Sequence, residues 1–325
     1  DNIWTNSGEQ PDGTDNDGNI YIDDLRGWDF VDGDNDPSPN LNEPEINSQA
    51  VHHGTIIAGI IGAVGGNGIG GSGISPNVRI MPLRALNSAG KGNVGTVMEA
   101  IRYAVAKGAD IINLSFVGTG FDTDLFLLLK ETMRKGVLVV AAVGNNEIIG
   151  ADLDASPLYP VCYSGQNGED AVLGVAALGR DDIRPRFSNY GANCVDLTAP
   201  GVDIYGPFLY RPARGLNQVS GLGSGSSLAA PIVSGVAALI KAINPAYKAQ
   251  EIRDILLASA DPVVDSDPAF RGKLGRGRIN ARKAVELALG GGGVSLIAGD
   301  IPHLLIAPYS RAAPEVSIRL TSGIA

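Results

Sequence analysis

Residues 111–145 read IINLSFVGTGFDTDLFLLLKETMRKGVLVVAAVGN, and this stretch decides the fold. Two apolar runs, 111–116 and 137–143, flank a segment with helical periodicity at 124–135. Gly136 follows that segment, at the position where a helix C-cap favours glycine. Two strands joined through a helix lie parallel in one sheet, and their crossover is right-handed. The stretch therefore predicts a βαβ unit.

The same alternation extends in both directions along the chain. Strand patterns that are apolar on both faces are typical of a sheet covered by helices on both sides. Further strands are expected at 78–82, 172–176 and 195–197, and further helices at 53–64, 95–107 and 229–243. The sequence thus predicts an α/β fold of three layers, doubly wound around a mostly parallel sheet.

The chain divides into one large domain and a tail. Residues 1–50 are rich in Asp, Asn, Gly and Pro, which predicts a long structured loop region rather than a core element. Regular patterns continue as far as Leu289, so one domain is expected at 1–289. Four consecutive glycines follow, and we interpret 290–325 as a linker with a tail or the start of another domain. Apolar residues alternate in that tail at Val316, Ile318 and Leu320.

The composition excludes several classes of partner. The 325 residues are 44% hydrophobic and 18% charged, which is typical of a compact soluble protein. The formal net charge of -10 repels phosphate backbones and anionic lipids, so neither nucleic acid nor a membrane is an expected partner. No uninterrupted apolar run reaches the length of a membrane span. The two cysteines, Cys162 and Cys194, form either one disulfide or two buried thiols.

Two segments carry chemistry. The first is HGTIIAG at 53–59, a histidine at the start of an apolar helix, which alone fits a capping or core histidine. The second is GSGSSLAAP at 223–231, a glycine-rich turn that runs into a helix, which alone indicates an N-cap at Ser226 or Ser227. A serine at this turn would also have an exposed Oγ, with backbone N–H groups and the positive end of the helix dipole facing the same point.

Together these segments resemble the histidine and serine motifs of the subtilase family. The resemblance makes His53 the catalytic base and Ser227 the nucleophile. The AAVGN segment at 141–145 resembles another motif of the family and makes Asn145 an amide donor to the oxyanion hole, although alone it fits a turn. The resemblance covers 2–281 and implies a secreted or extracytoplasmic serine endopeptidase that cleaves polypeptides through an acyl-enzyme.

The resemblance also implies where a substrate would lie. The INLS segment at 112–115 resembles the strand that pairs with the substrate backbone. Val117 stands where the family usually has glycine beside its primary specificity pocket, so a branched side chain would crowd the substrate there. The expected substrate-binding residues are Leu114, Ser115, Phe116, Val117, Ala142 and Gly144.

One catalytic group has no match in the sequence. The family carries its aspartate in Asp-Thr-Gly or Asp-Ser-Gly at the end of an apolar strand before the histidine, and neither tripeptide occurs here. We therefore expect an N-terminal fragment carrying that strand, or a propeptide, as a partner. The 325-residue chain alone is expected to be a poor protease. The competing hypothesis is a pseudoprotease that keeps the same fold as a binding scaffold.

The acidic N-terminal loop suggests a cation site. The resemblance to Asp- and Asn-rich calcium loops, with Gly18 at the sharp turn, implies a structural calcium ion. The expected ligands are Asp15, Asp17, Asn19 and Asp24, with Asp32, Asp34 and Asp36 as a weaker second set. Without a metal, the same residues would form a solvated acidic loop.

Three other enzyme classes fit less well. GIGGSG at 68–73 satisfies the dinucleotide fingerprint, but it follows a helix and precedes Ser75 and Pro76 instead of opening a helix. An α/β-hydrolase would need its histidine after the serine, where only His303 stands. A chymotrypsin-like fold is all-β and lacks the alternation of strands and helices seen here.

Overall fold

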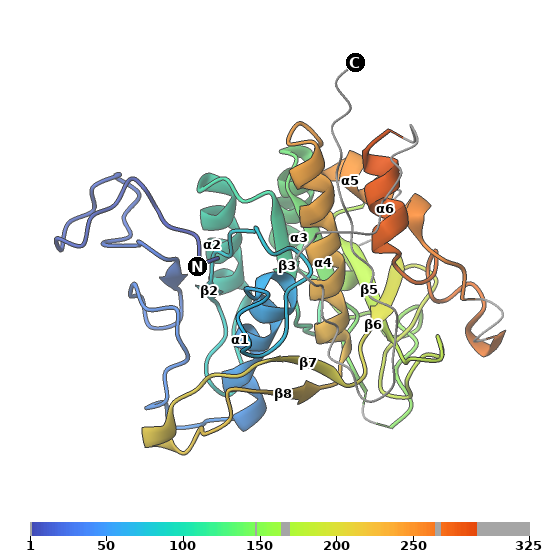
Figure 1. The fold of residues 1–325 in the computed structure, drawn as a ribbon, viewed down its shortest axis with the longest axis horizontal. Helices are drawn as coiled ribbons and strands as arrows, with labels where there is room; N and C mark the ends of the chain where they lie inside the picture. The colour runs from blue at the N-terminus through green and yellow to red at the C-terminus, as the bar shows by residue number, and fades with distance from the viewer. Residues whose placement is uncertain (1, 147, 164–169, 264–267, 291–325) are drawn as a thin grey trace.

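The computed structural model describes residues 2–146, 148–163, 170–263 and 268–290 of the chain. A four-stranded parallel sheet in the order β3-β4-β5-β6 forms its centre (Figure 1). The strands are β3 (Ile111–Leu114), β4 (Leu138–Ala142), β5 (Leu173–Leu178) and β6 (Leu197–Pro200). Helix α3 (Thr123–Arg134) connects β3 to β4, so the predicted βαβ unit is confirmed.

Helices cover both faces of this sheet. Alternate residues of β4 point to opposite sides: Val139 and Ala141 pack in a cluster with α3 and α2 (Val94–Ala106). Leu138 and Val140 pack in a second cluster with helices of the other face. These are α4 (Ser226–Ile243), α5 (Ala249–Ser259) and α6 (Ala281–Ala288). The three-layer α/β fold expected from the sequence is therefore confirmed.

Helix α4 is long and apolar enough to cross a membrane by length and composition alone. However, 67% of that segment is buried inside the protein. Its apolar residues, such as Val233, Ala237 and Ile240, pack against the sheet at 0% exposure. The hydrophobicity of α4 thus follows from its place as a core helix.

Two short sheets complete the fold. Strand β1 (Trp28–Asp29) pairs in parallel with β2 (Leu83–Arg84). Strands β7 (Ile204–Pro207) and β8 (Ser220–Gly223) form an antiparallel hairpin beside α1 (Ser48–Gly62) (Figure 1). The strand expected at 78–82 is wrong in position: only Ile80 makes an isolated bridge, to Ile3, and the regular pairing begins at Leu83.

The N-terminal region is ordered by long-range charge pairing rather than by regular secondary structure. Arg84, which is 8% exposed, forms ion pairs with Asp29, Asp32 and Glu43. The Glu43 carboxylate also accepts the backbone N–H of Ser88. A buried guanidinium needs several acceptors, and this loop supplies them. Asp32, part of the weaker metal set, is thus engaged with Arg84.

Several boundaries differ from the sequence predictions. Helix α1 begins at Ser48, five residues before the expected start at His53, because the Asn47 side chain accepts the N–H groups of Gln49 and Ala50 and caps it. Helix α4 begins at Ser226, three residues before the expected Ala229. No helix opens after the glycines at 68–73. Val316, Ile318, Leu320 and His303 lie outside the described residues.

Cys162 and Cys194 form a disulfide, with Cα atoms 4.6 Å apart. It joins the segment that precedes β5 to the segment that precedes β6, next to the core cluster of α2 and α3. Of the two states that the sequence left open, the structure has the disulfide.

Candidate active site

Ser227 is the second residue of α4. The N-cap is Gly225, which has no side chain, so neither Ser226 nor Ser227 caps this helix as the isolated motif suggested. The Asn145 side chain takes that role instead: its Oδ1 accepts the backbone N–H of Ser226 at 3.0 Å. A donor that the first turn of a helix leaves unpaired is thus satisfied from the end of β4.

The hydroxyl of Ser227 and the side-chain amide of Asn145 converge on one point. A Cβ placed on Gly225 would lie 3.0 Å from Ser227 Oγ and 3.3 Å from Asn145 Nδ2. Because Asn145 Oδ1 already binds Ser226, its Nδ2 remains available to donate. In the part of the chain that the structure describes, the N–H of Ser227 has no acceptor either. Two N–H donors therefore lie close to the hydroxyl of Ser227.

His53 lies in the second turn of α1, and this helix packs against α4. Ile56, one turn after His53, belongs to the same apolar cluster as Leu228, the residue that follows Ser227. His53 is half-buried, and burial lowers the pKa of its imidazole below the ordinary value of 6.5. The neutral imidazole is the form that can accept a proton.

His52, the residue before His53, connects α1 to the segment that follows β7. The ring of His52 stacks on Phe208, with centroids 4.7 Å apart, and its Nδ1 accepts the N–H of Leu209. Both partners follow β7, so the hairpin β7–β8 holds α1 in place.

The position of a triad carboxylate has no occupant among the residues with described positions. No Asp or Glu of the ranges 2–146, 148–163, 170–263 and 268–290 hydrogen-bonds to His53 or forms an ion pair with it. The imidazole therefore has no group there that would orient it or stabilise its charged form.

The expected substrate-binding residues fall into two groups. The side chains of Leu114 and Ala142 are buried in the core, at 6% and 1% exposure, so only their backbones could meet a ligand. Gly144 and Val117 are neighbours, because a Cβ on Gly144 would lie 2.8 Å from Val117 Cγ2. Gly144 has φ +80, a conformation that favours glycine. Val117 thus fills the space that this glycine leaves.

The other two residues of the set, Phe116 and Ser115, differ in their surroundings. Phe116 is partly buried and packs against the cluster of α2 and α3. Ser115 is only 8% exposed, and its hydroxyl donates to the backbone carbonyl of Ser227 at 2.9 Å. The side chain of Ser115 therefore points to the first turn of α4.

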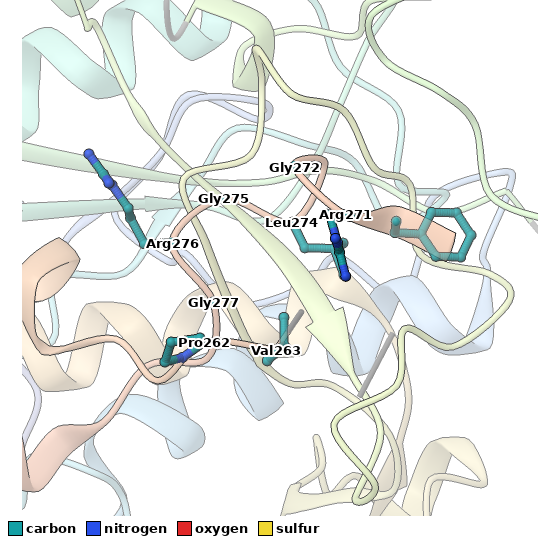
Figure 2. A pocket seen from close by; sticks show the side chains of 9 residues that line it. Pro262, Val263, Arg271, Gly272, Leu274, Gly275, Arg276 and Gly277 are labelled. Carbon is teal, nitrogen blue, oxygen red and sulfur yellow. The ribbon is translucent and has the colours of Figure 1, made fainter. Parts of the chain in front are cut away.

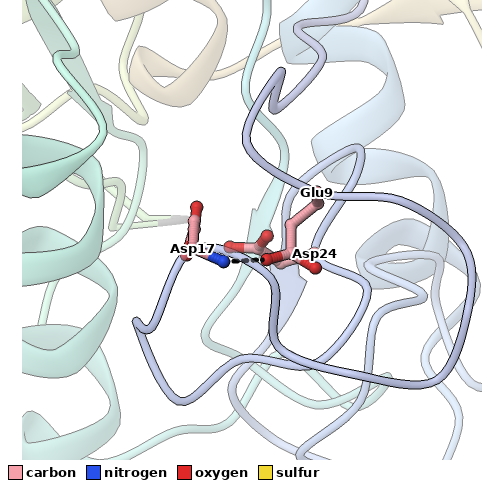
Figure 3. Close-up of side chains that lie close together, drawn as sticks. All are labelled: Glu9, Asp17 and Asp24. Atoms are coloured by element: carbon pink, nitrogen blue, oxygen red, sulfur yellow. Dashed lines mark hydrogen bonds between the residues drawn. The ribbon is translucent and has the colours of Figure 1, made fainter.

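An acidic cluster lies in the N-terminal loops, away from these motifs. Carboxylate oxygens of Glu9, Asp17 and Asp24 lie within 4.8 Å of one another and could hold a metal ion (Figure 3). Glu9 Oε1 accepts the N–H groups of Asn16 and Asp17 at 2.9 and 3.0 Å. Glu9 Oε2 is buried and has no hydrogen-bond partner within the described ranges.

Of the four residues expected to bind calcium, Asp17 and Asp24 belong to this cluster. Asn19 donates its amide to Asp24 at 2.8 Å and so lies beside it. Asp15 instead accepts the backbone N–H groups of Gly18, Asn19 and Ile20. Desolvation raises the pKa of Asp15, but these donors outweigh it and leave the pKa lowered.

The cluster also contains proton donors. Asp24, which is fully buried, accepts the hydroxyl of Tyr103 at 2.6 Å, and Lys107 forms an ion pair with Asp17. Both donors lie at α2, so the acidic loop is held against that helix. Glu9 was missed from the sequence because it stands well before the motif and joins it only through the fold.

A small pocket of ≈ 40 Å³ lies elsewhere, between 262–263 and 270–277 (Figure 2). Arg271 and Arg276 belong to its lining, but none of the motif residues does. It is therefore separate from the candidate active site.

Comparison with known proteins identifies the family of the chain. The profile of the subtilase family matches residues 7–286. Thermitase of Thermoactinomyces vulgaris is 34% identical over 262 residues, 81% of this chain and 81% of that protein. A halolysin-like extracellular serine protease of Natrialba magadii is 33% identical over 259 residues, 80% of this chain and 42% of that protein.

Solved structures show the same relationship. A protease structure from Pseudoalteromonas arctica superposes with a TM-score of 0.63 at 28% identity, covering 81% of this chain and 83% of that one. The chain spans about half the length of several of its relatives, such as 56% of a thermophilic serine proteinase of Bacillus sp. strain AK1 and 46% of a halolysin. From residue 7 to residue 286, the chain belongs to the subtilase family of serine endopeptidases.

Proposed function

We propose that the protein is a serine endopeptidase in which Ser227 is the nucleophile, His53 the general base and Asn145 a donor of the oxyanion hole. The observation that carries this proposal is the convergence of Ser227 Oγ and Asn145 Nδ2 beside Gly225. The space beside a glycine at this point leaves room for the oxygen of a tetrahedral intermediate.

The reaction follows from these groups. Ser227 Oγ attacks the carbonyl carbon of a peptide bond while neutral His53 takes its proton. The negative charge on the carbonyl oxygen is stabilised by the N–H of Ser227 and the amide of Asn145. His53 then gives the proton to the leaving amine, and an acyl-enzyme remains on Ser227. Water, activated by His53, hydrolyses that ester and restores the hydroxyl.

The substrate is an extended polypeptide, which would bind along the backbones of 114–117 and 142–144. Main-chain hydrogen bonds at such an edge give affinity without much sequence preference. The crowding of Gly144 by Val117 favours a small side chain next to the scissile bond. Secretion is supported by the relative from Natrialba magadii, which is named an extracellular protease.

We further propose that a parallel strand carrying an aspartate completes the site. The parallel pairing is interrupted: β2 pairs only with β1, and β3 only with β4, among the strands that the structure describes. Leu83 of β2 nevertheless packs against the core cluster that contains Ile112 and Leu114 of β3. An added strand between them would satisfy both free edges and bring a carboxylate to His53.

For calcium, we propose a site at Glu9, Asp17 and Asp24. Carboxylate oxygens are preferred calcium ligands, and the buried Glu9 Oε2 would otherwise lack any partner in the described chain. The ion would compete with the ammonium of Lys107, which already neutralises part of the cluster. The domain at 1–289, ending just after α6, would carry both this site and the catalytic residues.

The activity is tested by labelling the full-length protein, including any segment that precedes residue 1, with a fluorophosphonate. We expect Ser227 to be modified, and Ser227→Ala to abolish both labelling and peptide cleavage. A folded protein whose Ser227 stays unlabelled would establish the pseudoprotease alternative instead.

The added strand is tested separately with the 325-residue chain, in cis or as a second polypeptide. Supplying the aspartate-bearing strand should raise both the melting temperature and peptide cleavage, whereas the same strand with Asp→Asn should raise only the melting temperature. Full activity of the isolated chain would contradict the proposal.

The calcium site is tested by thermal unfolding with and without the ion. Calcium at 100 times its Kd should stabilise the fold by about 2.7 kcal/mol. Glu9→Gln should remove most of this effect, whereas Asp36→Asn, in the loop outside the cluster, should keep it. Equal calcium responses of Glu9→Gln and wild type would contradict the site.

A further inference from the structure

A backbone carbonyl next to the nucleophile lacks its usual helical partner. In an α-helix the C=O of residue i accepts the N–H of residue i+4. For Ser227 this residue is Pro231, which lies in the second turn of α4 and has no N–H. The hydroxyl of Ser115 takes its place and donates to Ser227 O at 2.9 Å.

Ser115 is itself held by a second residue of the same strand. Asn113 Nδ2 donates to Ser115 Oγ at 2.9 Å, which leaves the hydroxyl proton of Ser115 directed to Ser227. Asn113 Oδ1 in turn accepts the hydroxyl of Ser234 at 2.9 Å. Ser234 is 2% exposed and stands seven residues, or two turns, after Ser227 on the same face of α4.

These bonds form a continuous polar chain between β3 and α4. It leaves α4 at Ser234, passes through the two polar side chains of the β3 segment, and returns to α4 at Ser227. The hydroxyl of Ser234 also lies 3.2 Å from the carbonyl oxygen of Ala230 in its own helix. Connected networks of this kind hold their members in one arrangement. The chain ties the first turn of α4, and with it the nucleophile, to the central sheet.

We propose that Ser115 is a positioning residue that fixes the backbone of Ser227, rather than a side chain that contacts substrate. The proposal rests on the proposed peptidase function and deepens it. Displacement of a reacting group by about 1 Å can cost 10²-fold in rate, so a shift of Ser227 should lower kcat. Loss of a substrate contact would instead raise KM.

Substitutions of Pro231 and Ser115, alone and combined, test this role in the full-length protein. Ser115→Ala should lower kcat by about 10- to 100-fold, with KM within about twofold of wild type. Pro231→Ala restores an N–H that can donate to Ser227 O. The double variant Ser115→Ala/Pro231→Ala should therefore recover most of the kcat lost in Ser115→Ala, and Ser115→Thr, which keeps the hydroxyl, should stay close to wild type.

A matched control separates positioning from stability. Ser259 is a fully buried serine of α5 whose hydroxyl donates to Leu256 O at 2.8 Å. Ser259→Ala removes a comparable buried hydroxyl and should leave kcat unchanged. Hydrogen exchange of 226–230 should rise in Ser115→Ala and return in the double variant, which gives a readout that does not depend on activity.

The outcomes distinguish this proposal from the proposed function. If wild type neither cleaves peptides nor labels at Ser227, the function is wrong, whereas exchange at 226–230 still tests the hydrogen bond. If wild type is active and Ser115→Ala raises KM with kcat intact, Ser115 is a substrate contact and the positioning role is wrong. An unrescued double variant would equally overturn it.

Discussion

Asn145 accepts the backbone N–H of Ser226 at 3.0 Å, so the segment that follows β4 caps the helix that carries Ser227. One amide side chain thereby has two uses. Its oxygen satisfies the helix terminus, and this contact directs its nitrogen to the point beside Gly225 where Ser227 Oγ also lies. The side chain proposed as an oxyanion donor is therefore oriented by the helix that carries the proposed nucleophile.

Because the oxygen and the nitrogen of Asn145 make different contacts, substitutions can separate its two roles. Asn145→Ala removes both contacts and should lower kcat by about 10²- to 10³-fold, the loss known for the corresponding donor in subtilisin itself. It should also cost about 1 kcal/mol of stability through the lost cap. Asn145→Asp keeps an oxygen for the Ser226 N–H, so it should retain stability but lose activity. An Asn145→Asp variant with wild-type kcat would contradict the assignment.

Gly225 should be intolerant of any side chain for a chemical reason. The Cβ of Gly225→Ala would lie 3.0 Å from Ser227 Oγ, in the space for the substrate oxygen. We expect peptide cleavage to fall by at least 100-fold while the melting temperature changes little. The control is Gly54→Ala in α1, where a Cβ meets nothing within 4 Å. Similar activity of the two variants would argue against an oxyanion site at Gly225.

The pKa of His53 depends on whether a carboxylate lies beside its imidazole. Burial lowers its pKa below 6.5, so the folded state binds fewer protons than the unfolded state between the two pKa values. His53 therefore destabilises the fold as the pH falls below its ordinary pKa, and this effect is absent above it. A facing carboxylate would raise the pKa.

NMR titration can follow this change, because the chain has only three histidines and His53→Gln identifies the signal. In the 325-residue chain the resonance of His53 should titrate below 6.5, and it should move upward when an aspartate-bearing strand is added. The strand with Asp→Asn should leave it unmoved. No response to either strand would refute a carboxylate partner at His53.

Arg84 should be essential to the order of the N-terminal loops. Arg84→Met leaves the buried Asp29 and the largely buried Glu43 without their cation, so the free energy of unfolding in urea should fall by about 3–5 kcal/mol. Lys91→Met is the control, because the pair of Lys91 with Glu45 is exposed and should contribute at most about 1 kcal/mol. Equal losses of unfolding free energy in both variants would show that the buried ion pairs of Arg84 stabilise the fold no more than an exposed pair.

The central fold was predictable because its signals are local. The βαβ unit at 111–142 combines an uninterrupted strand pattern, a periodic helix and a glycine C-cap, and each agrees with the others. The strand expected at 78–82 was misplaced because an apolar run does not show which residues will pair with a neighbouring strand. Leu83 and Arg84 pair with Trp28 and Asp29, and that choice depends on the distant loop.

The residues of the candidate site also differ in whether a local sequence pattern reveals them. His53, Asn145 and Ser227 were found from short motifs, and the structure brings the helix of His53 and the Asn145 side chain to the start of α4. Glu9 and the hydroxyl of Ser115 have no local signature, because their partners lie far along the chain. Glu9 lies 15 residues before Asp24, and Ser115 lies 112 residues before Ser227.

The burial of α4 has a consequence for the way the protein is made. His53 and Asn145 leave the ribosome well before Ser227, which arrives on the apolar helix that closes one face of the sheet. Until that helix docks, its first turn lacks the Asn145 cap, and Ser227 lacks its neighbours on α1 and after β4. If Ser227 is the nucleophile, as proposed, we therefore expect no peptidase activity from the chain before α4 has docked on the sheet.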